Sequence, residues 1–203
     1  MSATAAPAAS DRADFRTVTI GGAKIGLITA AAVVAFLVVS RHVPGLPARL
    51  LETLVVLGAG IAVTFLPAQW TVARTGDGIA AAAAMGLVGT VTFMAIDIVL
   101  LRPFRAYPWT WDALGGNSPW WYLPIWWMLG TFLAWTGGIV MAGYAARGEP
   151  TLGRAATPAL AATLVAVTVA RLAGLHVILP VAAGVAFTIT LAVLAVVALA
   201  RKP

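Results

Sequence analysis

Six long apolar runs limit what this chain can fold into more than any other feature of its sequence. A helix needs about 20 apolar residues to cross the hydrocarbon layer of a bilayer, and each run reaches or approaches that length. The sequence therefore predicts an all-α integral membrane protein, a polytopic bundle of about six transmembrane helices with short loops. The expected helices cover roughly residues 24–42, 50–72, 78–101, 121–146, 157–174 and 175–200.

Few charged residues are available to cover a water-facing surface: 61% of the 203 residues are hydrophobic and 10% are charged. A soluble domain of this size carries about 25% charged residues, so most of the outer surface must face an apolar environment. The formal charge is +6, but the 13 Lys and Arg residues are scattered at the ends of apolar runs and form no phosphate-binding stripe. We therefore expect this surface to contact a lipid bilayer and no nucleic acid.

A polar stretch rich in Ala, Ser and Thr precedes the first apolar run. A secretory signal would place its charges first and an apolar run directly after them, followed by a cleavage site. Residues 1–23 are therefore predicted to be a retained, disordered tail, and residues 24–203 a six-helix transmembrane domain. The turn at Ala173–His176 is very short, so five crossings, with the last two helices as one broken unit, stay open as an alternative.

Six of the eight tryptophans fall between the third expected helix and the first turns of the fourth. Trp is enriched at the membrane–water boundary, where its ring lies in hydrocarbon and its N–H reaches water. This segment is expected to be an extramembrane connection on one membrane face that contacts a neighbouring protein, lipid or pigment. Its tryptophans are Trp109, Trp111, Trp120, Trp121, Trp126 and Trp127.

The distribution of Lys and Arg predicts the orientation of the bundle. With both termini in the cytoplasm, the inner segments hold eight of these residues and the outer segments hold five, a bias that follows the positive-inside rule. The Trp-rich connection would then lie outside. Ala- and Arg-rich usage is typical of GC-rich bacterial coding, so we expect the cytoplasmic (inner) membrane of a bacterium.

Small residues at a spacing of four predict where helices meet, because lipid gives no hydrophobic drive for helix association and close backbone contact must replace it. The row in the fourth helix consists of Gly130, Ala134, Gly138 and Ala142. The third helix carries Gly86 on a similar face, and the second carries Gly58. We expect these faces to pack against other helices of this chain or against another subunit.

Ionisable residues inside a membrane are costly, so each one is a candidate for function. Asp97 is the strongest, because it lies about one turn from the end of the third helix and continues the face of Thr90 and Phe93. It has two interpretations: a structural ion pair with a nearby arginine, or a proton or ion site. The predicted polar site on the outer face comprises Asp97, Arg102, Arg105, Arg171, Glu52, His42 and His176.

No catalytic residue, metal or cofactor site is predicted. The two histidines lie on separate hairpins, at helix ends, without an H-x-x-x-H or E-x-x-H pattern, which disfavours metal and haem ligation. The absence of cysteine excludes iron–sulfur clusters, thiolate metal sites and disulfides. A bound lipid, quinone or pigment is compatible with the outer face.

Three functions fit the sequence. The first is a non-catalytic multi-pass subunit or assembly partner of a larger membrane complex, docking through small-residue faces and the Trp-rich segment. The second is a small oligomeric transporter or channel that uses Asp97 with Arg102, Arg105 and Arg171. The third is a membrane enzyme or quinone-binding protein, which the small number of acid–base groups disfavours. Expected partners are the bilayer and other membrane subunits or further copies of this chain.

Overall fold

The computed structural model describes residues 10–101, 122–146, 148 and 151–201, and within them it contains six long helices and no strand. The helices are α1 (Phe15–His42), α2 (Gly45–Trp70), α3 (Gly76–Ile96), α4 (Tyr122–Ala145), α5 (Leu152–Leu172) and α6 (Leu179–Ala200). A short π-helix, η1 (Asp97–Leu101), continues α3. Each long helix is long and apolar enough to cross a membrane, so the all-α class and the six apolar helices are confirmed.

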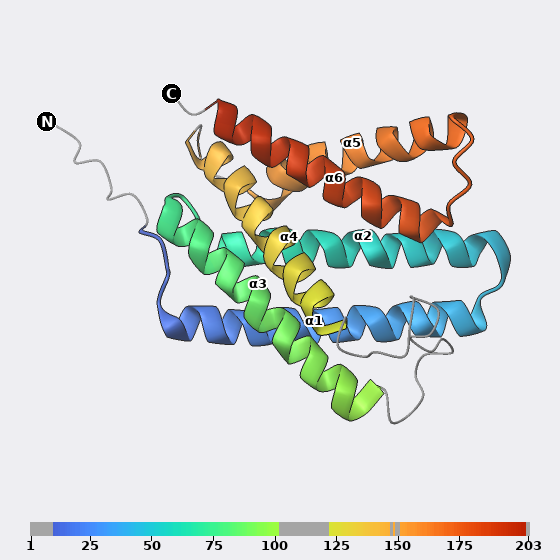
Figure 1. The fold of residues 1–203 in the computed structure, drawn as a ribbon, viewed down its shortest axis with the longest axis horizontal. Helices are drawn as coiled ribbons and strands as arrows, with labels where there is room; N and C mark the ends of the chain where they lie inside the picture. The colour runs from blue at the N-terminus through green and yellow to red at the C-terminus, as the bar shows by residue number, and fades with distance from the viewer. Residues whose placement is uncertain (1–9, 102–121, 147, 149–150, 202–203) are drawn as a thin grey trace, which may run out of the picture.

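Successive helices run in opposite directions, so the bundle has two ends (Figure 1). We call the end where α1 begins and α6 finishes the termini end. The other end holds the α1–α2 turn, the α5–α6 connection and the start of α4, and we call it the Trp126 end. In Figure 1, α3 and α4 run obliquely across α1 and α2. The closest helix pairs are α1 with α3, α3 with α4, and α1 and α4 with α2.

Helix α1 begins at Phe15, nine residues before the expected start at 24. Asp14 caps it, because its carboxylate accepts the backbone N–H of Thr17 at 2.9 Å and the Thr17 hydroxyl at 2.6 Å. The first turns are too polar to be recognised by hydropathy, yet Gly21 and Gly22 are buried there. The segment expected to be a disordered tail is thus helical from Phe15 on, while residues 1–9 lie outside the described residues.

Helices α5 and α6 also begin at other places than expected. Thr151 caps α5 by accepting the backbone N–H of Arg154 at 3.3 Å, so α5 starts at Leu152 and not at residue 157. Helix α6 starts at Leu179, after a turn at Gly174 (φ +83°) and an extended stretch. The connection between them is therefore longer than the tight hairpin that the sequence indicated, and α5 and α6 are two separate helices.

Glycines bring the backbones of α1, α3 and α4 together, and we call this contact the glycine seam. A Cβ placed on Gly26 of α1 would lie 2.7 Å from the carbonyl oxygen of Gly89 in α3. A Cβ on Gly86 of α3 would lie 2.6 Å from the carbonyl oxygen of Gly130 and 2.5 Å from Cβ of Ala134, both in α4. Such distances leave room for hydrogen only, so any larger side chain must move a backbone.

The small-residue row of α4 lies on buried positions, which are Gly130, Ala134, Gly138 and Ala142. Helix α2 meets α4 at Gly137, where a Cβ would collide with the carbonyl oxygen of Thr64. Gly58 of α2 is different: it is exposed and has open space at its Cβ position. Gly58 therefore does not mark a contact with another described helix of this chain, and of the two expected partners only another subunit stays a prediction.

The segment before α1 folds back over the α2–α3 turn at the termini end. The carboxylate of Asp11 accepts the backbone N–H groups of Arg74, Thr75 and Gly78, each at 3.0 Å, and also the Thr75 hydroxyl. Thr75 is the N-cap residue of α3 but makes no side-chain cap bond to that helix. Asp11 therefore caps α3 in its place, from a segment more than 60 residues away in the chain.

These contacts favour the charged form of Asp11. Partial burial raises the pKa of its carboxyl, but the hydrogen bonds from Thr75, Arg74 and Gly78 together outweigh burial and hold the pKa below its usual value. The pKa of Asp14 is also lowered, by its hydrogen bonds with the Thr17 side chain and backbone. Both carboxylates are thus ionised when they cap their helices.

Candidate functional site

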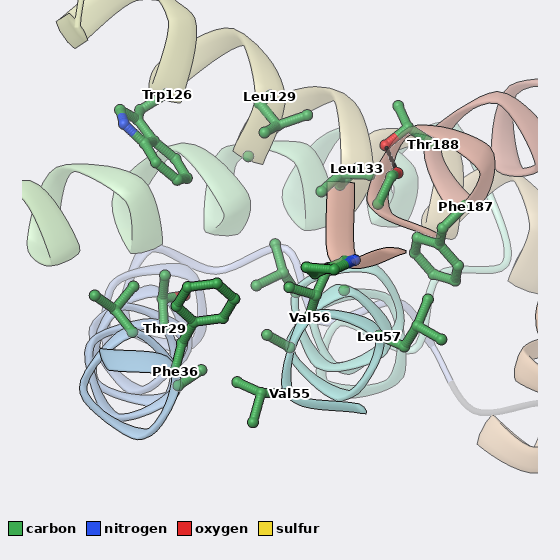
Figure 2. Close-up of a pocket in the computed structure, with 18 of the residues that line it drawn as sticks. Thr29, Phe36, Val55, Val56, Leu57, Trp126, Leu129, Leu133, Phe187 and Thr188 are labelled. Carbon is green, nitrogen blue, oxygen red and sulfur yellow. Dashed lines mark hydrogen bonds between the residues drawn. The ribbon is translucent and has the colours of Figure 1, made fainter. Parts of the chain in front are cut away.

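A cavity of about 620 Å³ lies among five helices, α1, α2, α3, α4 and α6, toward the Trp126 end (Figure 2). Its volume is within the range of about 300–1,000 Å³ that is typical of small-molecule sites. Its walls come mainly from α1, α2 and α6, and α3 and α4 close it with fewer residues. Its lining side chains include Thr29, Phe36, Val56, Ala59, Trp126 and Thr188.

Among the residues that the structure describes, the lining contains no ionisable side chain, and its hydroxyl groups are already bonded. Thr29 donates to the carbonyl of Ile25, Thr90 to that of Gly86, and Thr188 to that of Gly184, each at 2.9 Å. These are bonds to the preceding turn of the same helix, the usual way in which a helical Thr satisfies its hydroxyl. The cavity therefore favours hydrocarbon over a polar or charged guest.

Aromatic rings border the cavity on opposite sides. Figure 2 shows Trp126 and Phe36 toward one side and Phe187 toward the other. The Trp126 ring packs edge-on against Phe93, with ring centroids 5.5 Å apart and planes at 61°. Gly60 leaves room beside Phe187, since a Cβ there would lie 3.1 Å from that ring. The rings fix the width of the cavity without filling it.

The cavity opens sideways, to the outer surface of the bundle. Val181, Val185 and Ile189 line it and are 47%, 55% and 60% exposed. They repeat every four residues, so the opening follows one face of α6. A guest could enter between helices without passing either end of the bundle.

A polar cluster adjoins the cavity at the Trp126 end, between α1 and α2. Glu52 is buried there; its Oε1 accepts the Ser40 hydroxyl at 2.9 Å and its Oε2 accepts Arg49 Nη1 at 3.0 Å. Glu52 lies one turn before Val56 on α2, and Ser40 one turn after Phe36 on α1. The Ser40 hydroxyl also lies 2.9 Å from the Phe36 carbonyl of its own helix, so its one hydrogen is shared between that carbonyl and Glu52. The contact with Glu52 joins the two helices just beyond the apolar walls. We call Ser40, Arg49 and Glu52 the Glu52 cluster.

Asp97, the strongest candidate from the sequence, is buried at the start of η1. It lies one turn beyond Phe93, so it too adjoins the apolar walls of the cavity. Its expected partners Arg102 and Arg105 lie outside the described residues. Asp97 thus begins a π-helical turn that continues α3 at its C-terminal end.

The structure does not gather the remaining predicted polar residues into one site. Arg171 donates from Nη2 to the carbonyl of Val177 at 2.6 Å, and this bond braces the α5–α6 connection. Figure 1 places that connection well apart from the end of α3, so Arg171 is not beside Asp97. His42 and His176 are exposed at two different connections. Within the described residues, no three His, Cys, Asp or Glu side chains are grouped in a way that could hold a metal ion.

Two of the six clustered tryptophans belong to the described part of the chain. Trp126 lines the cavity, and Trp127 is 40% exposed. The other four lie outside the described residues; they are Trp109, Trp111, Trp120 and Trp121. Outside this cluster, Trp70 lies at the termini end, where Lys24 Nζ is 5.7 Å from its ring centroid.

Comparison of the chain with family models, curated proteins and solved structures gives no match.

Sequence reasoning did not find the cavity. The signal in the sequence is the stripe of α2 that runs from Glu52 through Val56 and Ala59 to Val63, in which a buried acid is followed by small and branched apolar residues. An ordinary packed helix face has the same pattern of residues. Only the arrangement of the five helices distinguishes a cavity wall from such a face.

Proposed function

We propose that this protein is a non-catalytic integral membrane protein whose cavity holds the hydrocarbon part of a lipid-derived ligand. The observation that carries the proposal is the cavity of about 620 Å³, whose described lining residues include none that is ionisable and whose hydroxyls are bonded to their own helices. An apolar hollow that opens sideways is accessible to molecules dissolved in a bilayer, and it does not require them to pass through water.

The dimensions of the cavity suit a chain from one leaflet. The lining residues of α1 extend from Ile25 to Phe36, which is about 16 Å at about 1.5 Å per residue. Those of α2 extend from Val55 to Val63, about 12 Å. Half of a hydrocarbon core of about 30 Å is about 15 Å, so an acyl or isoprenoid chain of one leaflet matches the hollow. The tail of a quinone belongs to the same chemical class.

This geometry favours binding over transport of a polar solute through the cavity. A transported ion or polar molecule needs groups along its path that replace its hydration shell. The lining hydroxyls donate to backbone carbonyls, and none of the described lining residues is ionisable, so these walls offer little in place of water. A route that uses Asp97 would have to lie outside this cavity.

A pair of neighbouring positions in α2 gives a matched test. Ala59 lines the cavity, whereas the adjacent Gly58 faces open space on the outside. Ala59→Phe should fill the hollow and lower the amount of co-purified or added lipid per protein by about tenfold, while Gly58→Phe should leave it unchanged. Lipid is measured by mass spectrometry after extraction of the purified protein. Equal lipid content in the two variants would refute the proposal.

A role as an assembly partner is a second candidate, favoured by the outward face of α4. Ile125, Met128 and Trp135 are exposed on it, and Phe132 packs beside Trp135 at 6.5 Å between ring centroids. Exposed aromatic and Met side chains are enriched at protein interfaces. Native mass measurement after gentle extraction should find a stoichiometric companion subunit or a second copy of the chain. A lone monomer would count against this role.

We also propose that both termini face the cytoplasm of a bacterial cell, so that the Trp126 end lies outside. The excess of Lys and Arg in the segments that would then lie inside supports this orientation. The chain has no cysteine, so single cysteines at Ser10 and His42 can report it. A membrane-impermeant thiol reagent applied to intact cells should label position 42 and not position 10; the reverse pattern would invert the orientation.

A further inference from the structure

The Glu52 cluster gives the cavity a polar end, and from it we infer the chemistry of the ligand's head. We propose that the ligand is a phospholipid, with one acyl chain in the cavity and its phosphate at Arg49. This inference rests on the proposed function, because it assumes that the cavity holds a chain.

One face of α2 joins the two parts of the site. Arg49, Glu52, Val56, Ala59 and Val63 are spaced by three and four residues in turn, so they form a single stripe along the helix. The last three line the cavity, and the first two form the charged end. A ligand that lies along this stripe therefore has its chain at Val56 and its head about 10 Å away at Arg49.

Glu52 holds the guanidinium group of Arg49 without hiding it. The carboxylate is buried, and each of its oxygens accepts one hydrogen bond, from Ser40 and from Arg49. The Arg49 side chain remains 51% exposed, and in its hydrogen bonds it uses one of its five N–H donors. A half-exposed guanidinium group that is held by one carboxylate keeps N–H donors with which it can bind a phosphate.

The charge and depth of the cluster fit a lipid head. Arg49 places a half-exposed cationic group near the start of α2, and a cationic group attracts an anion. Arg49 lies one turn inside α2, next to the exposed apolar residues Leu46 and Leu50. A basic residue bordered by exposed leucines is typical of the level where the hydrocarbon ends and lipid phosphates begin.

The test measures binding of three probes to the purified full-length protein in detergent. They are dioleoyl phosphatidylglycerol, dioleoylglycerol, which has the same chains and no phosphate, and inorganic phosphate. The wild-type protein should bind the phospholipid about tenfold or more tightly than dioleoylglycerol, the gain expected of one charge-assisted contact. Inorganic phosphate should displace neither lipid at low millimolar concentration.

Variants separate the head from the chain. Arg49→Gln should reduce the preference for the phospholipid to threefold or less and leave the affinity for dioleoylglycerol unchanged. The double variant Arg49→Gln with Glu52→Gln should reduce the preference equally. The second substitution is included because it removes the buried charge that Glu52 would otherwise carry without its arginine partner. Arg154→Gln, at the exposed start of α5, is the control and should keep the full preference.

Each outcome decides a different point. A double variant that folds and keeps the tenfold preference overturns the phosphate assignment, while the cavity proposal stands. Displacement of the phospholipid by inorganic phosphate shows a site for free anions and overturns the lipid as its source. If the wild-type protein binds neither lipid, the proposed function fails, and this inference fails with it.

Discussion

The glycine seam and the cavity use the same residue type to opposite effect. At the seam, a Cβ on Gly26 or Gly86 would lie 2.5 Å from a side-chain Cβ and also within 2.7 Å and 2.6 Å of a backbone carbonyl oxygen of the neighbouring helix. At the cavity, the nearest atoms to a Cβ on Gly60 or Gly184 belong to side chains, at 3.1 Å and 3.4 Å. Glycine permits backbone contact in the first region and leaves space in the second.

This difference indicates how the bundle divides stability from function. Helices in lipid associate through close packing, and the seam supplies such packing between α1, α3 and α4. Around the cavity, α1, α2 and α6 leave a volume that their own side chains do not fill. The seam can therefore hold the fold while the cavity stays free to bind and release the lipid chain that we propose for it.

The largest expected effect is at the seam. Gly86→Leu must displace Ala134 or the Gly130 backbone, so it should destabilise the protein by about 3 kcal/mol or more, the upper range for overpacking. The matched control Gly58→Leu adds the same side chain where space is open and should change stability by about 0.5 kcal/mol or less. Unfolding in detergent, followed by circular dichroism, measures both. If the two variants unfold alike, the seam does not hold the bundle.

A smaller effect is expected at the termini end, where Asp11 caps α3 beside the seam. Asp11→Ala should cost about 1 kcal/mol at neutral pH, as for the loss of a helix cap, whereas the exposed neighbour Ser10→Ala should cost nothing measurable. The pKa of Asp11 is lower in the folded than in the unfolded protein, so its contribution is complete above pH 3.8 and is lost as pH falls below that value.

The measurement is the difference in unfolding free energy between wild type and Asp11→Ala as a function of pH. This difference should be constant from pH 7 to about 5 and shrink below pH 3.8. A difference that grows toward low pH would mean that the cap acts in the protonated form, contrary to the geometry.

The smallest effect on stability is expected inside the cavity, and its sign is opposite to that of the effect at the seam. Ala59→Phe adds a ring to empty space, so after removal of lipid the variant should be as stable as the wild type or more stable by about 1 kcal/mol. Gly58→Phe provides the baseline for a ring on the outside of α2. If Ala59→Phe lowers the stability as much as Gly86→Leu does, the cavity is closed in solution.

The sequence made the six helices predictable because the length of an apolar run is set by the thickness of the bilayer. It did not reveal the start of α1, because the turns from Phe15 to Ala23 are held by the Asp14 cap and by burial of Gly21 against α3. The cap and the burial both depend on contacts with other residues, and a hydropathy profile does not take such contacts into account. The same holds for Thr151, whose cap moves the start of α5 ahead of Pro158.

The candidate site was predictable only in its local parts. Helical periodicity placed Asp97 on the face of Gly86, Thr90 and Phe93, and all four are buried. Glu52 was recognised as a costly ionisable group, but its neighbours Ser40 and Arg49 were not, since the Ser40 contact joins two helices. The cavity depends on how five helices diverge, and no single stretch of sequence carries that information.

The central claim is that a lipid chain occupies the cavity, and photo-crosslinking tests it most directly. The purified protein is reconstituted with a phospholipid that carries a diazirine near the end of one acyl chain, irradiated, digested and mapped by mass spectrometry. The account predicts strong labelling of the cavity wall at Val56–Val63, well above that of the exposed α5 positions Val165 and Val169. Equal labelling of both regions, or none at Val56–Val63, would contradict it.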